Sequence, residues 1–188
     1  MKQSEQSDTQ IVKESLQNPA AFIKLYERYF DRIWRYFNYR FYYYPDVCED
    51  LTAQTFENAL TKIHQYDFKR GEFPAWLFGI ARNICNRYLN NLNRIEILPT
   101  ENIEYLATKD DPAEIKIIND EIKIDLIRHV QELSERKKEL IALKFAGCFS
   151  NRQIGEITGL TEQNVAVILF RTIRELREKL DGKENANG

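Results

Sequence analysis

The chain of 188 residues is poor in the residues that build metal centres, disulfide networks and acid–base catalysis. It has three cysteines, Cys48, Cys85 and Cys148, with no CxxC spacing, and two histidines, His64 and His129, far apart. Neither a zinc site nor a disulfide framework is therefore expected. We expect the thiols to be buried or half-buried in a reducing cytoplasm and the histidines to lie on helix surfaces. No nucleophile–base set or phosphate loop is present, so we expect no enzyme, metal or cofactor.

Long hydrophobic runs and an excess of basic charge are also missing. No apolar run approaches ~18 residues, so we expect no membrane insertion. The polar start MKQSEQSDTQ does not resemble a signal peptide. Basic residues number 27 and acidic residues 29, a net charge of −2, so any affinity for nucleic acid must come from local patches.

Glycine and proline are scarce, at 7 and 5 residues, and the apolar residues recur at helical spacing. The sequence therefore predicts an all-α protein in which the prolines mark helix starts and joints. The expected early helices are Asp8–Gln17, Phe22–Tyr44, Asp46–Tyr66 and one from Pro74 to Arg94. Later helices are expected from Pro112, from Ser134 to Gly147, and on both sides of Gly159. We expect two helical domains, 1–94 and 112–181, a flexible acidic linker, 95–111, and a disordered tail, 182–188.

Two of the early helices carry stripes with more than one interpretation. Seven of the ten tyrosines lie between Tyr26 and Tyr44, and we favour a core helix over a cofactor or base-stacking role. In Asp46–Tyr66 the predicted buried stripe is Val47, Leu51, Phe56, Leu60 and Ile63. Its polar, acidic stripe is Glu49, Asp50, Gln54, Glu57 and Asn58. That second stripe fits either a solvated face or a docking face for a basic partner.

Between Tyr66 and Arg94, five basic residues and two acidic ones are interleaved with aromatic side chains. Guanidinium groups suit phosphates, aromatic faces suit bases and Asn amides suit base edges, so this segment has the composition of a single-stranded DNA site. Part of the same pattern fits an ordinary buried stripe, which would consist of Trp76, Leu77, Ile80 and Ile84.

The segment from Ser150 to Leu180 predicts a helix-turn-helix. Asn151 begins its first helix, Gly155 permits a close crossing, Gly159 supplies a positive φ in the turn, and Thr161 caps the second helix. The expected inward-facing residues are Ile154, Ile157, Leu160, Val165, Ile168 and Leu169. The alternative is a helical hairpin that binds nothing.

Three segments, in this order and spacing, resemble bacterial RNA polymerase sigma factors of the extracytoplasmic-function subgroup. They are CEDLTAQTF (Cys48–Phe56), FPAWLFGIARN (Phe73–Asn83) and LSERKKELIALKFAGCFSNRQIGEITGLTEQNV (Leu133–Val165). The resemblance implies a sigma factor that binds core RNA polymerase and directs promoter recognition and melting, with promoter DNA and an anti-sigma factor as further partners. The alternative is a polymerase-independent helix-turn-helix regulator, which would not need the acidic helix or the basic–aromatic segment.

The resemblance also assigns residues to three surfaces. The polymerase-binding residues are Glu49, Asp50, Gln54, Glu57 and Asn58. Those for single-stranded DNA of the minus-ten element are Phe68, Lys69, Arg70, Phe73, Trp76, Arg82, Asn83, Asn86, Arg87 and Asn90. Those for duplex DNA of the minus-thirty-five element are Arg152, Thr161, Glu162, Gln163, Asn164, Val167, Arg171 and Arg174.

The chain departs from the family pattern at two places. Arg87 and Asn90 stand where the family often has Asp and Arg, which points to a different trapped base. Ala166, Val167 and Ile168 stand where the family commonly has Lys, Ser and Arg. Because few basic residues lie early in this helix, we expect the free chain to bind duplex DNA weakly.

Overall fold

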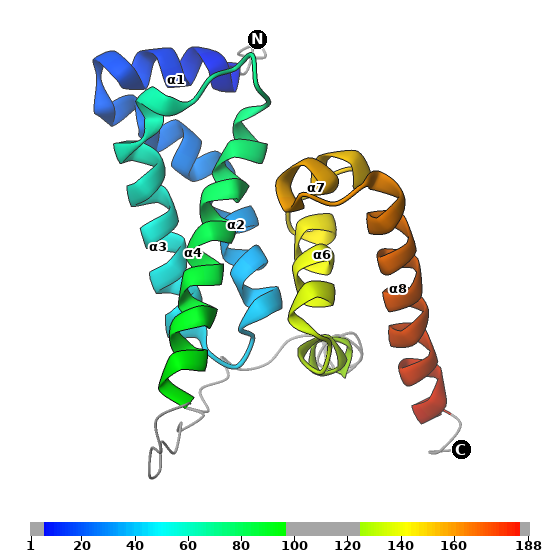
Figure 1. The fold of residues 1–188 in the computed structure, drawn as a ribbon. Coiled ribbons are helices and arrows are strands. Elements are labelled where there is room, and N and C mark those ends of the chain that lie inside the picture. The colour runs from blue at the N-terminus through cyan, green and yellow to red at the C-terminus, as the bar shows by residue number, and fades with distance from the viewer. Residues whose placement is uncertain (1–5, 97–124, 185–188) are drawn as a thin grey trace. The chain divides into compact units, whose positions relative to one another are not determined.

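The computed structural model describes residues 6–96 and 125–184 (Figure 1). Every regular element within those residues is helical, which confirms the all-α prediction. Contacts divide the chain into two units: residues 1–35 with 46–99, and residues 36–45 with 100–188. Most of the predicted linker and the start of the helix predicted from Pro112 lie outside the described residues.

Helices α1 to α4 and two short 3₁₀ turns form the N-terminal half of the chain. Their bounds are α1 Asp8–Gln17, η1 Pro19–Phe22, α2 Ile23–Arg40, α3 Pro45–Thr61, η2 Ile63–Gln65 and α4 Phe73–Glu96. The prediction for α1 is confirmed at both ends. Helix α2 ends earlier than predicted, since its last residue is Arg40 rather than Tyr44. Pro45 disfavours helical backbone at the residue before it, Tyr44, so α2 cannot continue unbroken into α3.

Local hydrogen bonds define the ends of α1. Ser7 Oγ accepts from the backbone N–H of Gln10 at 3.3 Å, and Gln10 Oε1 accepts from the N–H of Ser7 at 3.1 Å, which completes a capping box. At the other end, Asn18 Oδ1 accepts from the N–H of Ala20 at 3.1 Å and starts the turn that Pro19 opens. The helix therefore begins and ends where short-range chemistry predicts.

The buried stripe of α3 differs from the predicted one. Val47 is only half-buried and Leu60 is 38% exposed, so both predictions are wrong. The residues that α3 buries are Cys48, Leu51, Thr52, Thr55, Phe56 and Ala59. The two threonine hydroxyls donate to the carbonyls of Cys48 and Leu51, both at 2.7 Å. These bonds satisfy the hydroxyls inside the core, so threonine can take inward positions that hydrophobicity alone assigns to other residues.

An aromatic cluster closes one end of the core between α2 and α4. The ring of Phe73 lies 5.6 Å from Tyr29, 5.5 Å from Tyr66 and 5.6 Å from Trp76, measured between centroids. Farther along α4, the buried residues are Leu77, Phe78, Ala81, Ile84 and Cys85. Of the predicted stripe, Leu77 and Ile84 are therefore buried as expected, whereas Trp76 and Ile80 are half-buried.

The described part of the C-terminal half is also helical. Residues 125–131 are helical, and α6 Glu135–Phe145, α7 Asn151–Thr158 and α8 Glu162–Glu184 follow. Ser134 precedes α6 as predicted, although its side chain makes no capping hydrogen bond. Helix α8 continues to Glu184, so the prediction of a disordered tail is wrong for residues 182–184.

The turn between α6 and α7 depends on two adjacent residues, Gly147 and Cys148. The left-handed backbone, with φ +55°, lies at Cys148 and not at the glycine. Gly147 is instead required for space, because a Cβ there would lie 2.6 Å from the carbonyl oxygen of Leu143. Cys148 is exposed, which corrects the expectation of a buried or half-buried thiol, whereas Cys48 and Cys85 are buried.

The helix-turn-helix follows the predicted register closely. Ser150 and Gln153 form a capping box at the start of α7. Gly159 adopts φ +76°, and its N–H donates to the carbonyl of Gly155 at 2.8 Å. Thr161 Oγ1 accepts from the N–H of Asn164 at 3.2 Å and caps α8. The residues with buried side chains are Ile154, Val165 and Leu169, whereas Ile157, Leu160 and Ile168 are half-buried.

We expect Gly155→Ala to destabilise this motif, because the new Cβ would lie 2.6 Å from the backbone oxygen of Leu160. Overpacking of this kind costs about 1–3 kcal/mol, which exceeds the gain in helix propensity from alanine. Native-state hydrogen exchange of the α7 and α8 amides would measure the loss. Gly79→Ala in α4 is the matched control, since no atom lies within 4 Å of the position that its Cβ would take, and it should not speed exchange. Unchanged protection in Gly155→Ala would contradict the close approach.

Candidate nucleic-acid and partner-binding surfaces

The acidic stripe of α3 lies on the surface. Glu49, Asp50, Gln54 and Glu57 are exposed, and Asn58 is half-buried with its Nδ2 donating to the carbonyl of Gln54 at 2.7 Å. The sequence of α3 contains no lysine or arginine. Without internal cations to neutralise it, this face presents negative charge to its surroundings and suits a basic partner.

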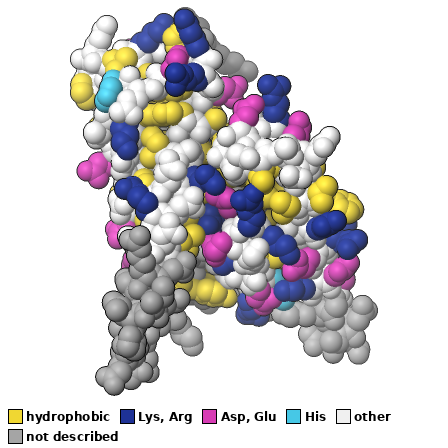
Figure 2. Space-filling view, in the orientation of Figure 1, with side chains coloured by type: hydrophobic (Ala, Val, Ile, Leu, Met, Phe, Trp, Pro, Cys, Tyr) yellow, Lys and Arg dark blue, Asp and Glu magenta, His cyan; other side chains and the backbone are white. Residues whose placement is uncertain are grey.

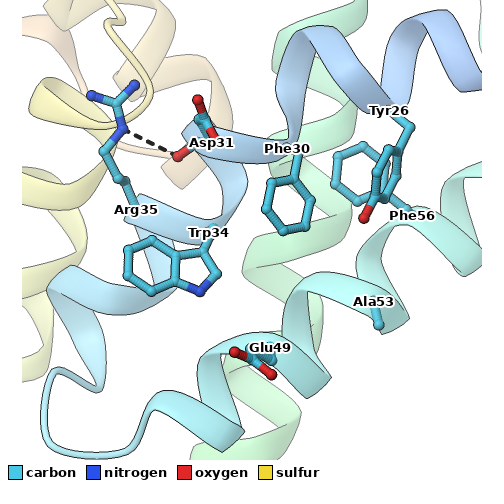
Figure 3. A pocket seen from close by; sticks show the side chains of 8 residues that line it. All are labelled: Tyr26, Phe30, Asp31, Trp34, Arg35, Glu49, Ala53 and Phe56. Atoms are coloured by element: carbon cyan, nitrogen blue, oxygen red, sulfur yellow. Dashed lines mark hydrogen bonds between the residues drawn. The ribbon is translucent and has the colours of Figure 1, made fainter. Parts of the chain in front are cut away.

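A groove of about 920 Å³ lies between α2 and α3, beside this stripe (Figure 3). Its α3 wall contains Glu49, so the groove and the acidic stripe are continuous. The aromatic rings of the groove pack on one another, with Tyr26 and Phe56 4.8 Å apart between centroids. The lining residues are Tyr26, Phe30, Asp31, Trp34, Arg35, Glu49, Ala53 and Phe56.

The assignment of α2 as a core helix missed this groove. Leu25, Tyr29 and Ile33 are buried and form the core stripe, as the helical period predicts. Tyr26, Phe30 and Trp34 repeat the same spacing one residue later and are exposed or half-buried. A second apolar stripe directly beside the first is the signal in the sequence that could have identified a groove.

The loop between η2 and α4 presents the basic and aromatic side chains predicted to face single-stranded DNA. The ring of Phe68 is 55% exposed, and Lys69 and Arg70 are exposed beside it. Asp67 shapes the loop, because its Oδ1 accepts from the N–H of Lys69 at 3.0 Å and its carbonyl accepts from the N–H of Arg70 at 2.9 Å. The Tyr66 hydroxyl donates to the carbonyl of Gly71 at 3.1 Å. The loop is therefore shaped by its own hydrogen bonds.

Phe73 does not belong to the exposed surface. Its side chain is 1% exposed and packs against Tyr29, Tyr66 and Trp76. Such a ring has no free face for a base, which corrects the prediction that Phe73 contacts DNA. Trp76 is half-buried in the same cluster. The two rings support the loop from below, and Phe68 is the aromatic side chain that the loop presents outward.

Helix α4 continues this surface with polar residues at helical spacing. Asn83, Arg87 and Asn90 are exposed and lie at positions i, i+4 and i+7, which share one face of a helix. Arg82 and Asn86 are half-buried beside that face. The structure thus brings the predicted residues of α4 together on a face that follows directly from the loop.

In the helix-turn-helix, the predicted duplex-binding residues are all exposed. They are Arg152, Thr161, Glu162, Gln163, Asn164, Val167, Arg171 and Arg174. Two of the arginines are engaged in surface ion pairs, Arg152 with Glu156 at 3.2 Å and Arg174 with Glu178 at 3.4 Å. To bind a DNA phosphate, each arginine would have to leave its carboxylate partner.

Phe170 is an exposed residue of α8 that the prediction of duplex-binding residues omitted. Its side chain is 67% exposed, more than that of any other large hydrophobic residue in the described ranges. It falls on the face of Gln163, Val167 and Arg174, at positions i, i+4, i+7 and i+11. Its place three residues after Val167 is the signal that marks it as part of this face.

Among residues 6–96 and 125–184, no helix is long and apolar enough to cross a membrane. The same residues contain no group of three or more His, Cys, Asp or Glu side chains that could hold a metal ion.

An acidic helix and a basic–aromatic loop in one part of an all-helical chain, with a helix-turn-helix in another, are the architecture of a sigma factor. Comparison with family models agrees: residues 25–95 match sigma-70 region 2, and residues 124–176 match sigma-70 region 4. The chain belongs to the bacterial sigma-70 family, in the extracytoplasmic-function (ECF) subgroup.

Two similar proteins carry the name ECF RNA polymerase sigma factor. The chain is 28% identical over 161 residues to the ECF RNA polymerase sigma factor BldN of Streptomyces coelicolor. The aligned region covers 85% of this chain and 60% of BldN. It is 26% identical over 131 residues to the ECF RNA polymerase sigma factor SigM of Bacillus subtilis. This alignment covers 70% of this chain and 78% of SigM. The solved structure of CnrH in complex with the cytosolic domain of CnrY shares the fold, with a TM-score of 0.59 and 18% identity over 97% of this chain and all of that one.

Proposed function

We propose that the chain binds core RNA polymerase and directs promoter recognition and melting at the start of transcription. The observation that carries the proposal is that one unit presents both an acidic helix with an adjoining aromatic groove and an exposed basic–aromatic loop. Membership of the sigma-70 family supports it. The working boundaries are residues 1–94 for polymerase docking and the minus-ten element, and residues 112–181 for the minus-thirty-five element.

Polymerase docking is assigned to α3 and the groove beside it. The exposed carboxylates Glu49, Asp50 and Glu57 would meet basic side chains of the partner, and Trp34 and Phe30 would receive apolar ones. Interfaces concentrate their binding energy in such aromatic anchors surrounded by polar groups. A partner helix with basic and apolar faces fits this surface.

Strand capture is assigned to the loop and to α4. An unpaired base can stack on the exposed ring of Phe68, while Lys69, Arg70 and Arg87 neutralise phosphates along the strand. The amides of Asn83 and Asn90, on the same face as Arg87, can pair with base edges. A paired base offers no such face, so binding of this kind favours the melted form of DNA and thereby promotes opening.

Duplex reading is assigned to the start of α8. Helix-turn-helix proteins place the N-terminal residues of the second helix against base edges in the major groove. Gln163 and Asn164 offer amides to adenine, and Glu162 can accept from cytosine. Arg171 and Arg174 lie about two to three turns later, where they can reach phosphates.

Two further features complete the proposal. The chain would act in the cytoplasm by binding alone, with catalysis left to the polymerase. An anti-sigma factor would be a second protein partner; CnrH, a protein of the same fold, is seen in complex with another protein, the cytosolic domain of CnrY. A helix-turn-helix regulator that acts without polymerase remains the rival function, and it has no use for the groove beside α3.

Pull-down of core polymerase followed by run-off transcription from a randomised promoter library tests the proposal. We expect the chain to retain core under reducing conditions and to direct transcripts from a shared promoter sequence. Core polymerase without the chain is the control. Failure to bind core would overturn the proposal, and DNA selection by the free chain without core would favour the regulator.

A further inference from the structure

Helix α1 lies across one end of the other helices of its unit, and the segment that joins α3 to α4 runs beside it (Figure 1). Ile11 and Val12 bury α1 against the unit, with 0% and 5% of their side chains exposed. Polymerase docking, strand capture and duplex reading, as assigned above, make no use of this helix. Its position beside the strand-capture loop raises the question of what it contributes there.

Polar contacts hold α1 in place from its first turn. Asp8 accepts from the hydroxyl of Tyr29 and from the guanidinium of Arg28, both at 2.5 Å. The ring of Tyr29 in turn packs 5.6 Å from that of Phe73, at the base of the loop. At the start of the loop, the Tyr66 ring packs 5.5 Å from that of Phe73, and its hydroxyl donates to the carbonyl of Gly71. The side chain of Asp8 therefore links α1, through Tyr29 and Phe73, to the residues that support and shape the loop.

One turn later, α1 places a cation over the exposed ring of the loop. Lys13 Nζ lies 5.8 Å from the ring centroid of Phe68. This is within the range of a cation–π interaction, which orients the ammonium toward the ring. Lys13 is exposed, and no described carboxylate forms an ion pair with it. Lys24, by contrast, pairs with Glu14 at 3.0 Å.

The residues near Lys13 indicate what kind of ligand it could bind. Lys69 and Arg70 follow Phe68 directly in the loop and are exposed, so the ring that Lys13 approaches belongs to a basic segment. In the view of Figure 2, Lys and Arg side chains lie among hydrophobic ones at the end of the unit where Figure 1 draws α1. Arg70 is paired with Asp67 at 3.6 Å, whereas Lys13, over the ring, has no such partner among the described carboxylates. An exposed ring that can stack on a base, with the ammonium of Lys13 over it, fits a single strand of nucleic acid.

We propose that Lys13 is a further DNA-binding residue and that α1 forms one side of the strand-capture site. The unpaired base stacks on the open face of Phe68, and the Lys13 ammonium neutralises an adjacent phosphate. The four-carbon stem of lysine spans from the ring to the backbone of the stacked nucleotide without a change in the loop. The inference rests on the proposed function, because it deepens the assignment of the loop to strand capture.

The test uses holoenzyme and fluorescent fork-junction DNA built on a promoter recovered from the library selection, titrated at several salt concentrations. Each phosphate neutralised on a single strand contributes about −0.7 to the slope of log K against log salt. We expect Lys13→Gln to make that slope shallower by about 0.7 and to lower affinity most at low salt. Lys13→Arg should restore the slope, and Lys24→Gln, which removes the same charge outside the site, should match wild type. Phe68→Ala should lower affinity without changing the slope, since it removes no charge.

Two results would overturn the inference. One is a Lys13→Gln slope equal to those of wild type and Lys24→Gln. The other is a loss of affinity at unchanged slope together with faster hydrogen exchange in residues 66–72, which would mean that Lys13 only positions the loop. Core binding by each variant is measured first. If wild-type chain fails to bind core, the proposed function fails; if wild-type holoenzyme binds the DNA and Lys13→Gln behaves the same, only the inference fails.

Discussion

Holoenzyme that carries Phe68→Ala is expected to bind fork-junction promoter DNA about five- to 150-fold more weakly than wild type. The range corresponds to about 1–3 kcal/mol, the loss found when a base loses its aromatic stacking partner. Phe68 is 55% exposed and lies outside the aromatic cluster, so its removal should leave the fold intact. The same substitution at Phe73, which is 1% exposed, would instead disrupt the core.

Two comparisons separate stacking from other effects of this substitution. Phe68→Trp keeps an aromatic face and should retain affinity close to wild type. DNA that already contains an unpaired bubble should show the same defect in Phe68→Ala, because the ring acts on a base after it is unpaired. A defect that disappears on pre-melted DNA would mean that Phe68 assists strand separation and does not hold the captured base.

The helix-turn-helix is the part of the structure that local sequence determines most directly. Ser150 and Gln153 cap α7, Gly159 supplies the positive φ, and Thr161 caps α8, each within a few residues of its partner. The same is true of α1, which begins at a capping box and ends at Asn18. Short-range signals of this kind need no knowledge of the rest of the fold, so the helix bounds could be predicted from the residues.

The predictions fail where burial or contact of a side chain depends on more than the hydrophobic pattern of its own helix. Phe73 follows a basic loop and resembles a DNA-facing ring, but Tyr29 from α2 covers it. Thr52 and Thr55 are polar by type, yet hydrogen bonds to their own helix let them face inward. Lys13 and Phe68 are 55 positions apart in sequence and meet only because α1 folds back beside the loop. No periodicity within a single helix contains that information.

The second large effect is expected on polymerase binding. Glu49→Lys should weaken the affinity of the chain for core polymerase by about 30-fold or more, since like charges brought together at an interface cost several kcal/mol. Glu49 is exposed on α3 and also lines the groove between α2 and α3, so the new ammonium would meet both the basic and the apolar parts of a docked partner (Figure 3). Titration of labelled core with the full chain would measure the change.

Glu178→Lys is the matched control, because it makes the same charge change on an exposed face of α8, where the side chain is 70% exposed. It should bind core as wild type does. The Glu49→Lys defect should shrink as salt rises, since screening weakens contacts between exposed charges, while the share that comes from the groove persists. Equal affinity of Glu49→Lys and wild type would remove α3 from the docking surface.

Phe68 and Glu49 lie on different elements, so the two substitutions should have separate effects. Phe68→Ala should keep its affinity for core. Glu49→Lys, once saturated with core, should keep its affinity for fork-junction DNA. Independent effects of the two substitutions are expected because we assign polymerase binding to α3 and single-strand binding to the loop.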